Sequence, residues 1–406
     1  MEFKRLKERQ ELIDSIGKDK IKVITGLRRC GKSYLLNTIF KKYLLDNGFN
    51  ETNIVEIDLL RKDFNVRSKD QLFNIIEERI TRDTKFVFID EVQLAGDGFA
   101  EILKIEFYNH QDIDFYVTGS NSKTLSSMVV RELGMDAKEI KVNPLTYSEV
   151  VQDYDGFTVQ DYLEYGGIPY ILIRDEKERV SELFSLFNKT YISDILDRCK
   201  TNLITDRDVK EIIKKVLKDT TSEISDVNIA DKITKKSNCK QTEKISVRSE
   251  VADVIKKAKE SYLFIEFNDD EENESDINKP YKGYCIDIGL YNVDNKGNFP
   301  GQLENAVFLE LYLNGIVVHG GSVQREDGST GKIDFEFSHN SATTQIQVCY
   351  ILNDGNWDRE IMNLVDGGSS INKILVYYKD ESTKPSYDVK KVSINDFLKE
   401  GIMKYI

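Results

Sequence analysis

Cysteine and histidine, from which zinc sites and many catalytic triads are built, are scarce in this sequence. The chain of 406 residues contains five cysteines and three histidines. The cysteines form no C-x-x-C pair, which argues against a zinc site and a disulfide framework and favours the reducing cytosol. The histidines stand far apart, which argues against a histidine-based metal site or triad. The cysteines are Cys30, Cys199, Cys239, Cys285 and Cys349.

Long apolar runs are also missing. No stretch approaches the roughly 20 apolar residues that a membrane span needs, and the first residues are charged, unlike a signal peptide. Hydrophobic residues make up 40% and charged residues 31% of the chain, which is typical of a soluble globular protein. We therefore expect a cytoplasmic protein of two or three domains without a membrane partner.

Basic residues are fewer than acidic ones, with 57 Lys or Arg against 70 Asp or Glu, so the net charge is −13. Such a surface repels nucleic acid, so any DNA contact has to be local. Residues 232–259 are the candidate segment, with nine Lys or Arg against three acids. Residues 269–276 follow with six acids in eight positions, a pattern typical of a solvated loop or linker.

Residues 26–33 read GLRRCGKS and match the phosphate-loop pattern G-x-x-x-x-G-K-[ST] at every fixed position. A β-branched run, residues 21–25, precedes the loop, and apolar residues at helical spacing follow it. Strand, glycine loop and helix are the context that this motif requires. The sequence therefore predicts that the chain binds ATP with Mg²⁺.

Each part of the loop has a predicted role. Glycines let backbone N–H groups approach the phosphates, and the N-terminus of the following helix adds partial positive charge. Lys32 is expected to reach the β- and γ-phosphates and the Ser33 hydroxyl to bind Mg²⁺. Arg28 and Arg29 either add charge beside the phosphates or face solvent. The predicted nucleotide-binding residues are Gly26, Leu27, Arg28, Arg29, Cys30, Gly31, Lys32, Ser33 and Tyr34.

The carboxylates that an ATPase needs follow a second apolar run, residues 86–89. Asp90 is the predicted Mg²⁺ ligand and Glu91 the predicted general base that activates the attacking water. The next predicted strand, residues 114–118, leads into Ser120 and Asn121, which we expect to sense the γ-phosphate or position water. Alternatively, these two residues only form a turn.

Strands and helices alternate over residues 21–118, which favours an α/β domain with a doubly wound parallel sheet. Helices dominate from about 145 to 266, and helices 206–219, 225–234 and 246–260 with strand 262–267 suit a winged-helix unit. The alternative is a helical lid with a solvated basic face. From 280 onward the chain reads as α+β. Its predicted strands are 283–288, 315–319, 332–337, 344–350 and 373–378, and its predicted helices are 302–314 and 357–366.

These motifs together resemble a group of prokaryotic AAA-type ATPases with a C-terminal domain of unknown function similar to restriction-endonuclease folds. That resemblance implies an AAA-type core, a winged-helix-like middle and an endonuclease-like end, with predicted boundaries 1–142, 143–268 and 281–406. The matching segments are ITGLRRCGKS (24–33), FIDEVQ (88–93), TGSNS with LSS (118–127), NPLTYSE (143–149), YGGIP (165–169), CIDIGL (285–290), ENAVFLE (304–310), IDF (333–335) and IQVC (346–349).

Two departures from that family pattern bear on activity. Met135 and Asp136 stand where family members commonly carry Gly-Arg, and such an arginine would stabilise transition-state charge. Arg131 lies nearby in the sequence as a substitute. Efficient hydrolysis is therefore in question, whereas nucleotide binding is not. Sites of this type are often completed by an arginine of a neighbouring subunit, so a homo-oligomer or protein partner stays an open alternative.

The second departure concerns the C-terminal domain. An active nuclease of that fold uses an Asp and a Glu-x-Lys pair on neighbouring strands to bind Mg²⁺. Asp334 is present, with Glu336 expected on the same strand face, but Gln347 and Cys349 replace the Glu and Lys. We interpret the domain as a structural or binding remnant. The alternative is a nuclease that uses Glu304 or Glu310, although both also suit a helix face packed on the sheet edge.

The sequence thus predicts an Mg²⁺-dependent AAA-type ATPase that couples nucleotide state to a winged-helix region and a C-terminal domain. The first alternative is a nucleotide-gated module that binds DNA or protein with little turnover. The second is a nuclease that uses the C-terminal domain.

Overall fold

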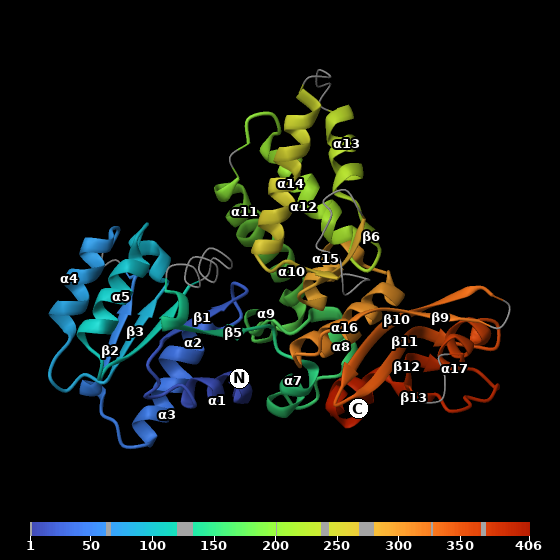
Figure 1. Ribbon diagram of the computed structural model, residues 1–406, viewed down its shortest axis with the longest axis horizontal. Helices are drawn as coiled ribbons and strands as arrows, with labels where there is room; N and C mark the ends of the chain where they lie inside the picture. The colour runs from blue at the N-terminus through green and yellow to red at the C-terminus, as the bar shows by residue number, and fades with distance from the viewer. Residues whose placement is uncertain are drawn as a thin grey trace. The chain divides into compact units, whose positions relative to one another are not determined.

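The structure of this protein is a computed structural model (Figure 1). It describes residues 2–61, 66–119, 133–199, 201–236, 243–267, 280–325, 328–366 and 371–406. The chain divides into two compact units. The first comprises Met1–Pro144 with Glu260–Tyr262, and the second comprises Leu145–Lys259 with Leu263–Ile406.

The first unit is built on a five-stranded sheet in which every neighbouring pair is parallel. The strand order is β2-β3-β4-β1-β5, so β4 lies between the strand that precedes the phosphate loop and the strand that ends in Asp90. This sheet confirms the parallel α/β domain predicted from the sequence. The strands are β1 (Ile21–Gly26), β2 (Ile54–Asp58), β3 (Phe86–Asp90), β4 (Asp114–Thr118) and β5 (Ala137–Val142).

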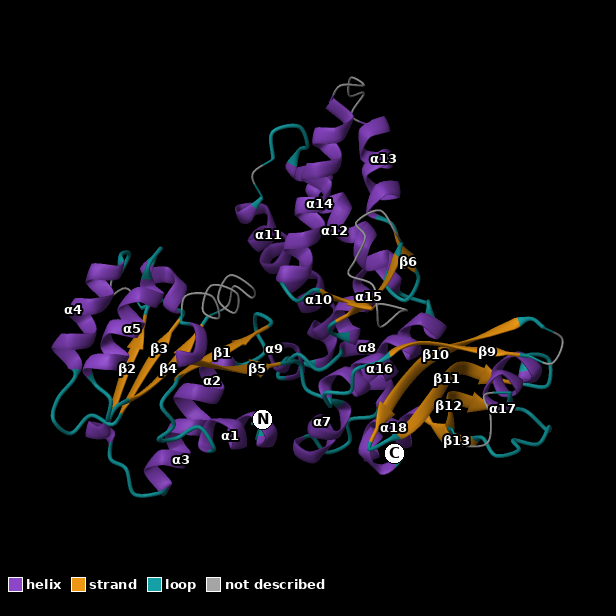
Figure 2. Ribbon diagram, in the orientation of Figure 1, coloured by secondary structure: helices purple, strands orange, loops and turns teal. Residues whose placement is uncertain are grey.

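Helices cover both faces of this sheet, and strands β1 and β3 are accordingly buried along their whole length (Figure 2). On one face, α4 and α5 bury residues such as Leu72 and Leu103 in a core shared with Val87 and Val117. On the other face, Phe40 packs against Phe88 and Tyr116 of the sheet, with ring centroids 5.8 and 4.9 Å away. The helices are α1 (Leu6–Ile13), α2 (Lys32–Tyr34), η1 (Leu35–Phe40), α3 (Lys41–Asp46), α4 (Lys69–Arg79) and α5 (Phe99–Asn109).

The second unit begins with helices, as expected. Threonine starts three of them with a capping box, in which its side chain and the third helical residue satisfy each other's backbone N–H groups. These helices include α7 (Tyr147–Asp153), α8 (Val159–Tyr165), α9 (Pro169–Leu172), α10 (Glu176–Leu186), α11 (Ile192–Arg198), α12 (Asp206–Asp219), α13 (Asp226–Lys236) and α14 (Lys244–Glu260).

A small antiparallel sheet accompanies the last three of these helices. Its strands are β6 (Glu223–Ile224), β7 (Phe264–Phe267) and β8 (Tyr281–Cys285), in the order β6-β8-β7. Along the chain, β6 stands between α12 and α13, and β7 and β8 follow α14. This succession agrees with the winged-helix prediction, which stays a prediction.

The C-terminal part of the second unit holds a five-stranded mixed sheet in the order β13-β12-β11-β10-β9. The β9–β10 and β10–β11 pairs are antiparallel, and the β11–β12 and β12–β13 pairs are parallel. The strands are β9 (His319–Gln324), β10 (Thr330–His339), β11 (Ala342–Leu352), β12 (Asn372–Asp380) and β13 (Lys390–Ser393). The helices are α15 (Ile288–Asn295), α16 (Phe299–Leu313), α17 (Asn363–Val365) and α18 (Ile394–Glu400), with a π-helical turn, η7 (Asp358–Met362), before α17.

Two predicted strands of this part were misplaced. The predicted strand 283–288 ends at Cys285, because the Asp287 side chain accepts a hydrogen bond from Leu290 N at 3.0 Å and thereby caps α15. The predicted strand 315–319 instead starts at His319, because Gly315 at φ 78° follows directly on the end of α16. Apolar residues alone did not reveal either helix boundary.

The glycine pair in residues 165–169 has a packing role in the second unit. A Cβ on Gly166 would lie 2.3 Å from the Asp287 carboxylate, and one on Gly167 would lie 1.9 Å from the Leu145 carbonyl oxygen. Asp287 accepts a hydrogen bond from Gly167 N at 2.7 Å. Most of the residues predicted as the middle and C-terminal domains lie in the second compact unit, and the predicted domain boundaries stay a prediction.

Within the described ranges, every helix is too short or too polar to cross a lipid bilayer.

Glu310 generates a prediction about pH and stability. Its side chain is buried on α16, where it accepts hydrogen bonds from Ile402 N and Asn314 Nδ2, and burial raises the pKa of this carboxyl to about 8. A folded-state pKa above the unfolded value of about 4.3 means that this group's contribution to stability is lost as the pH rises through 8.

When the pH is raised from 5 to 9, we expect the melting temperature of Glu310→Gln to fall less than the melting temperature of the wild-type protein. The measurement is thermal unfolding at both pH values, with Glu178→Gln, an exposed glutamate of α10, as the control. Equal pH dependence in Glu310→Gln and wild type would contradict the prediction.

Candidate nucleotide-binding site

The phosphate loop adopts backbone angles that depend on glycine at two positions. Gly26 has φ 133° and Gly31 has φ 90°, and Arg29 between them has φ 70°. A Cβ on Gly26 would lie 1.9 Å from the Val142 carbonyl oxygen, so no other residue fits against β5 here. The loop is therefore closely packed on its own sheet, with the N-terminus of α2 directly behind it.

Lys32 lies inside the loop. Its side chain is buried, and its Nζ donates hydrogen bonds to the carbonyl oxygens of Gly26 at 3.0 Å and Leu27 at 3.1 Å. Burial lowers the pKa of this ammonium below its ordinary value, and the negative charges of Glu91 and Asp90 partly offset the effect. A phosphate bound beside the loop would place negative charge next to this ammonium.

Ser33 and Asp90, which the sequence predicts as Mg²⁺ ligands, lie side by side. The Ser33 hydroxyl donates to Asp90 Oδ1 at 2.9 Å, and the Thr118 hydroxyl at the end of β4 donates to the same oxygen. Burial raises the pKa of the Asp90 carboxyl, and the bonds from Thr118 and Ser33 offset part of that rise. The hydroxyl and the carboxylate are oxygen donors of the kind that Mg²⁺ prefers, so these residues fit the ion.

Glu91, the predicted general base, occupies a left-handed backbone conformation with φ 57°. Its N–H donates to the Thr118 hydroxyl at 3.1 Å, and its carboxylate accepts a hydrogen bond from the Gln93 side chain. Thr118 thus contacts both members of the Asp-Glu pair, and Gln93 contacts the carboxylate of the predicted base. The sequence interpretation gave neither residue such a role, although Gln93 falls in the matching segment 88–93.

The remaining loop residues divide into two groups. Leu27 and Cys30 are buried in the domain core, so only their backbone atoms can contact a nucleotide. Arg28 is half-buried, whereas Arg29 and Tyr34 are exposed. Their side chains are the ones placed to contact solvent or a ligand.

Arg5 is a part of the site that the sequence interpretation missed. This buried residue donates through Nη2 to the Cys30 carbonyl oxygen and through Nη1 to the Asn143 carbonyl oxygen, each at 2.7 Å. Its guanidinium also forms an ion pair with Glu8 at 3.2 Å. Arg5 therefore ties the phosphate loop to α1 and to the end of the first unit. The only sequence feature that could have drawn attention to Arg5 is its position directly before the helix α1.

The other residues that the sequence suggested for activity or marked as departures from the family pattern take no part in the described site. Ser120, Asn121 and Arg131 lie outside the described residues. Met135 is exposed, and Asp136, in place of the family's arginine, accepts a hydrogen bond from Tyr108 at 2.9 Å and pairs with Lys104 at 3.5 Å. The position of that missing arginine therefore carries an acidic group with two partners of its own.

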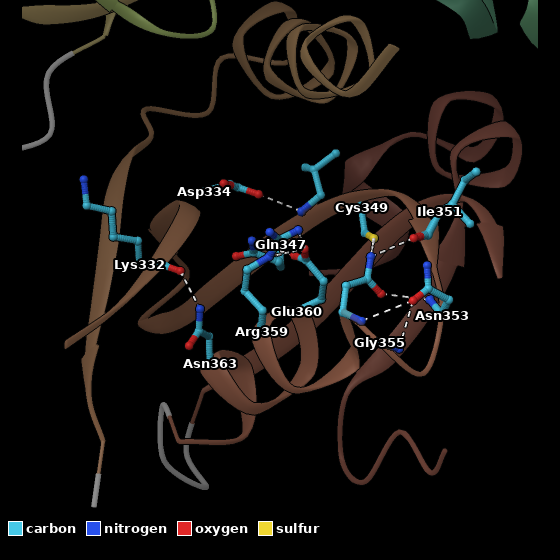
Figure 3. A network of polar contacts seen from close by, with 12 residues as sticks. Lys332, Asp334, Gln347, Cys349, Ile351, Asn353, Gly355, Arg359, Glu360 and Asn363 are labelled. Atoms are coloured by element: carbon cyan, nitrogen blue, oxygen red, sulfur yellow. Dashed lines mark hydrogen bonds and ion pairs between the residues drawn. The ribbon is translucent and has the colours of Figure 1, made fainter. Parts of the chain in front are cut away.

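The C-terminal polar residues meet on the mixed sheet (Figure 3). Asp334 accepts a hydrogen bond from Val348 N on β11 at 2.8 Å, and burial and the charge of Glu304 raise its pKa to about 7. Gln347 donates to Glu360 at 3.1 Å, and Glu360 is paired with Arg359. The carboxylate that Gln347 binds thus comes from the π-helical turn.

The other C-terminal candidates have structural partners. Glu304 forms an ion pair with Lys282 and accepts a hydrogen bond from Tyr284 at 2.7 Å, and Gln345 donates to Glu336 at 2.6 Å. The Cys349 thiol is buried, and burial raises its pKa to about 12, so it carries no charge at neutral pH.

Comparison with known proteins supports the assignment of the first unit. Residues 18–151 match the family model described as an AAA domain. This match supports an AAA-type, nucleotide-binding domain over these residues. The restriction-endonuclease-like identity of the C-terminal part has no such support and stays a prediction.

Two curated proteins resemble nearly the whole chain. An uncharacterized protein of Haemophilus influenzae is 26% identical over 91% of this chain and 92% of its own length. An uncharacterized protein of Methanocaldococcus jannaschii is 27% identical over 96% of this chain and 87% of its own. Both matches thus extend over most of each relative's length, and the names of the relatives state no activity.

Solved structures resemble the chain only remotely. The RuvB Holliday junction branch migration motor of Thermotoga maritima has a TM-score of 0.34 at 15% identity, covering 65% of this chain and 89% of RuvB. The replication initiator DnaA bound to AMPPCP and single-stranded DNA has a TM-score of 0.30 at 13% identity, covering 64% of this chain and 90% of DnaA. Scores this low do not bear on the function of this chain.

Thr118 generates a prediction about the predicted Mg²⁺ site. Thr118→Val removes the hydroxyl that contacts both Asp90 and Glu91 N, whereas Thr118→Ser retains it. We expect Thr118→Val to lower Mg²⁺-dependent ATP turnover about 10-fold or more, because groups that orient a metal ligand have effects of this size. The measurement is turnover against Mg²⁺ concentration, and equal loss in Thr118→Ser would assign the effect to packing instead.

Proposed function

We propose that this protein is an ATP-binding, Mg²⁺-dependent ATPase of AAA type that couples its nucleotide state to its winged-helix-like and C-terminal regions. The observation that supports it most directly is the contact between Ser33 Oγ and Asp90 Oδ1 at 2.9 Å, next to a phosphate loop that encloses Lys32. Lys32 and Ser33 lie in α2, directly after the phosphate loop, whereas Asp90 is the last residue of β3.

Each group has a definite task in this proposal. Backbone N–H groups of the loop and the Lys32 ammonium would bind the phosphates, and Ser33 and Asp90 would hold Mg²⁺. The ion would neutralise phosphate charge as the terminal phosphoryl group leaves. Glu91 accepts a proton from the attacking water, with its carboxylate oriented by Gln93.

The main alternative is a nucleotide-gated binding module with little turnover. It is favoured by Asp136 at the position of the family's arginine, since no positive charge from that residue can stabilise the transition state. The two functions differ in phosphate release, so a comparison of binding and turnover separates them.

Lys32→Ala and Glu91→Gln test the proposal together. We expect Lys32→Ala to weaken ATP binding at least about 10-fold, because the ammonium–phosphate contact is lost. We expect Glu91→Gln to bind ATP as wild type does but to release phosphate at least about 100-fold more slowly, because the general base is lost. Binding is measured with a fluorescent ATP analogue and turnover as phosphate release at saturating ATP.

The same assay tests the alternatives. Wild-type phosphate release no faster than that of Glu91→Gln would favour the low-turnover module, and wild-type behaviour of Lys32→Ala would contradict both functions. Turnover per chain that rises with protein concentration would indicate that a neighbouring subunit completes the site.

Nucleic acid is the second candidate partner, through residues 232–259. Lys232, Lys235 and Lys256 of this segment are exposed. However, ion pairs engage Arg248 with Asp231 at 2.6 Å, Lys259 with Glu266 at 2.6 Å, and Lys257 with Asp253. These pairs reduce the positive charge available to phosphates, so DNA binding through this segment would be weak and strongly salt-dependent.

For the C-terminal region we propose a structural or binding role. Gln347 offers an amide in place of a carboxylate and already contacts Glu360, and Cys349 supplies no positive charge. We expect no cleavage of plasmid DNA in the presence of Mg²⁺ or Mn²⁺, as followed by gel electrophoresis. Cleavage that disappears in Asp334→Ala would instead establish a nuclease.

A further inference from the structure

Three side chains at the ends of α4 and α5 come together although they are distant in the sequence. Glu77 lies in the last turn of α4, Glu106 in the last turn of α5, and His110 directly after α5. One ligand atom from each of the three lies within 4.8 Å of the other two. His110 Nε2 is 2.9 Å from Glu77 Oε1 and 3.5 Å from Glu106 Oε2.

Glu106 distinguishes this group from an ordinary surface cluster. Its side chain is 0% exposed, and among the described residues neither of its carboxylate oxygens has a hydrogen-bond partner. A buried carboxylate without a donor is costly, because it has lost its water without a replacement. The carboxylate of Glu77 lies beside it, and burial and this neighbouring carboxylate raise the pKa of the Glu106 carboxyl to about 7. A cation between the two carboxylates would compensate for both effects.

The chemistry of the three groups indicates which cation. One imidazole nitrogen and two carboxylate oxygens form a mixed donor set that suits Zn²⁺ and similar transition-metal ions, whereas Mg²⁺ prefers oxygen donors alone. Glu106 and His110 are four residues apart, which places both on one side of the helix end. Glu77 and His110 are half-exposed, so an ion can enter from solvent and complete its coordination with water.

The site is separate from the phosphate loop. Strand β3 follows α4 and strand β4 follows α5, so the C-terminal ends of both helices lead to the starts of parallel strands. Ser33, Asp90 and Thr118 lie at or beyond the opposite, carboxyl ends of the strands. An ion bound by the three residues would therefore link α4 to α5 without touching the nucleotide.

We propose that Glu77, Glu106 and His110 form a binding site for a divalent transition-metal ion of the Zn²⁺ class, which fastens α4 to α5. This assignment does not depend on ATP hydrolysis. It also departs from the expectation, based on the spacing of histidines and cysteines, that the chain has no such site.

Metal binding by the full-length chain tests the proposal. We expect metal-stripped protein to bind one equivalent of Zn²⁺ in calorimetric titration and to gain thermal stability from it. Glu77→Gln, Glu106→Gln and His110→Gln should each weaken Zn²⁺ binding at least about 10-fold, since each removes a ligand. Glu101→Gln, an exposed carboxylate of the same helix, is the matched control and should bind Zn²⁺ as wild type does.

Two further measurements separate this site from other metal sites. Co²⁺ should give d–d absorption without a thiolate charge-transfer band, because no cysteine is among the ligands. Lys32→Ala should bind Zn²⁺ as wild type does, because the phosphate loop takes no part. Absence of Zn²⁺ binding in wild type, unchanged binding in His110→Gln, or a thiolate band would each overturn the proposal.

Discussion

The hydrogen bonds that converge on Asp90 are the interaction on which the nucleotide site depends. Ser33 reaches this carboxylate from the helix behind the phosphate loop and Thr118 reaches it from the end of β4. The strand order explains the meeting, because β4 lies between β1 and β3 and presents Thr118 between their ends. Burial of this carboxylate is tolerated because two hydroxyl donors satisfy it.

Similar constraints shape the rest of the molecule. Arg5 binds the carbonyl oxygens of Cys30 and Asn143, so the beginning and the end of the first unit are tied to the phosphate loop. In the second unit, Asp287 caps α15 and binds Gly167, which unites helices of the middle region with the C-terminal part. In each case one buried charged group organises backbone from distant parts of the chain. Glu106 is the contrasting case, because no hydrogen bond from the described residues satisfies its carboxylate.

The sequence predicted the alternation of strands and helices over residues 21–118, because the strands in this range contain short apolar runs. It did not predict β5, whose sequence AKEIKV is no apolar run. The predicted strand 114–118 matches β4 in full, and the predicted helix 206–219 matches α12. Boundaries failed where a side chain decided them, as Asp287 did at the start of α15. The sequence interpretation also did not anticipate that Gly166 packs against Asp287, which is more than 100 residues further along the chain.

The sequence by itself determined the phosphate loop, the Asp-Glu pair and the alternation of strands and helices, because these features are local. Local spacing fixes which residues share a loop or a strand end, and therefore identifies Lys32, Ser33, Asp90 and Glu91. Only the tertiary structure decided which distant groups meet. Thr118 reached Asp90 through the strand order, and Glu77 reached His110 through the packing of α4 on α5. Such contacts depend on how elements pack, which no spacing along the chain encodes.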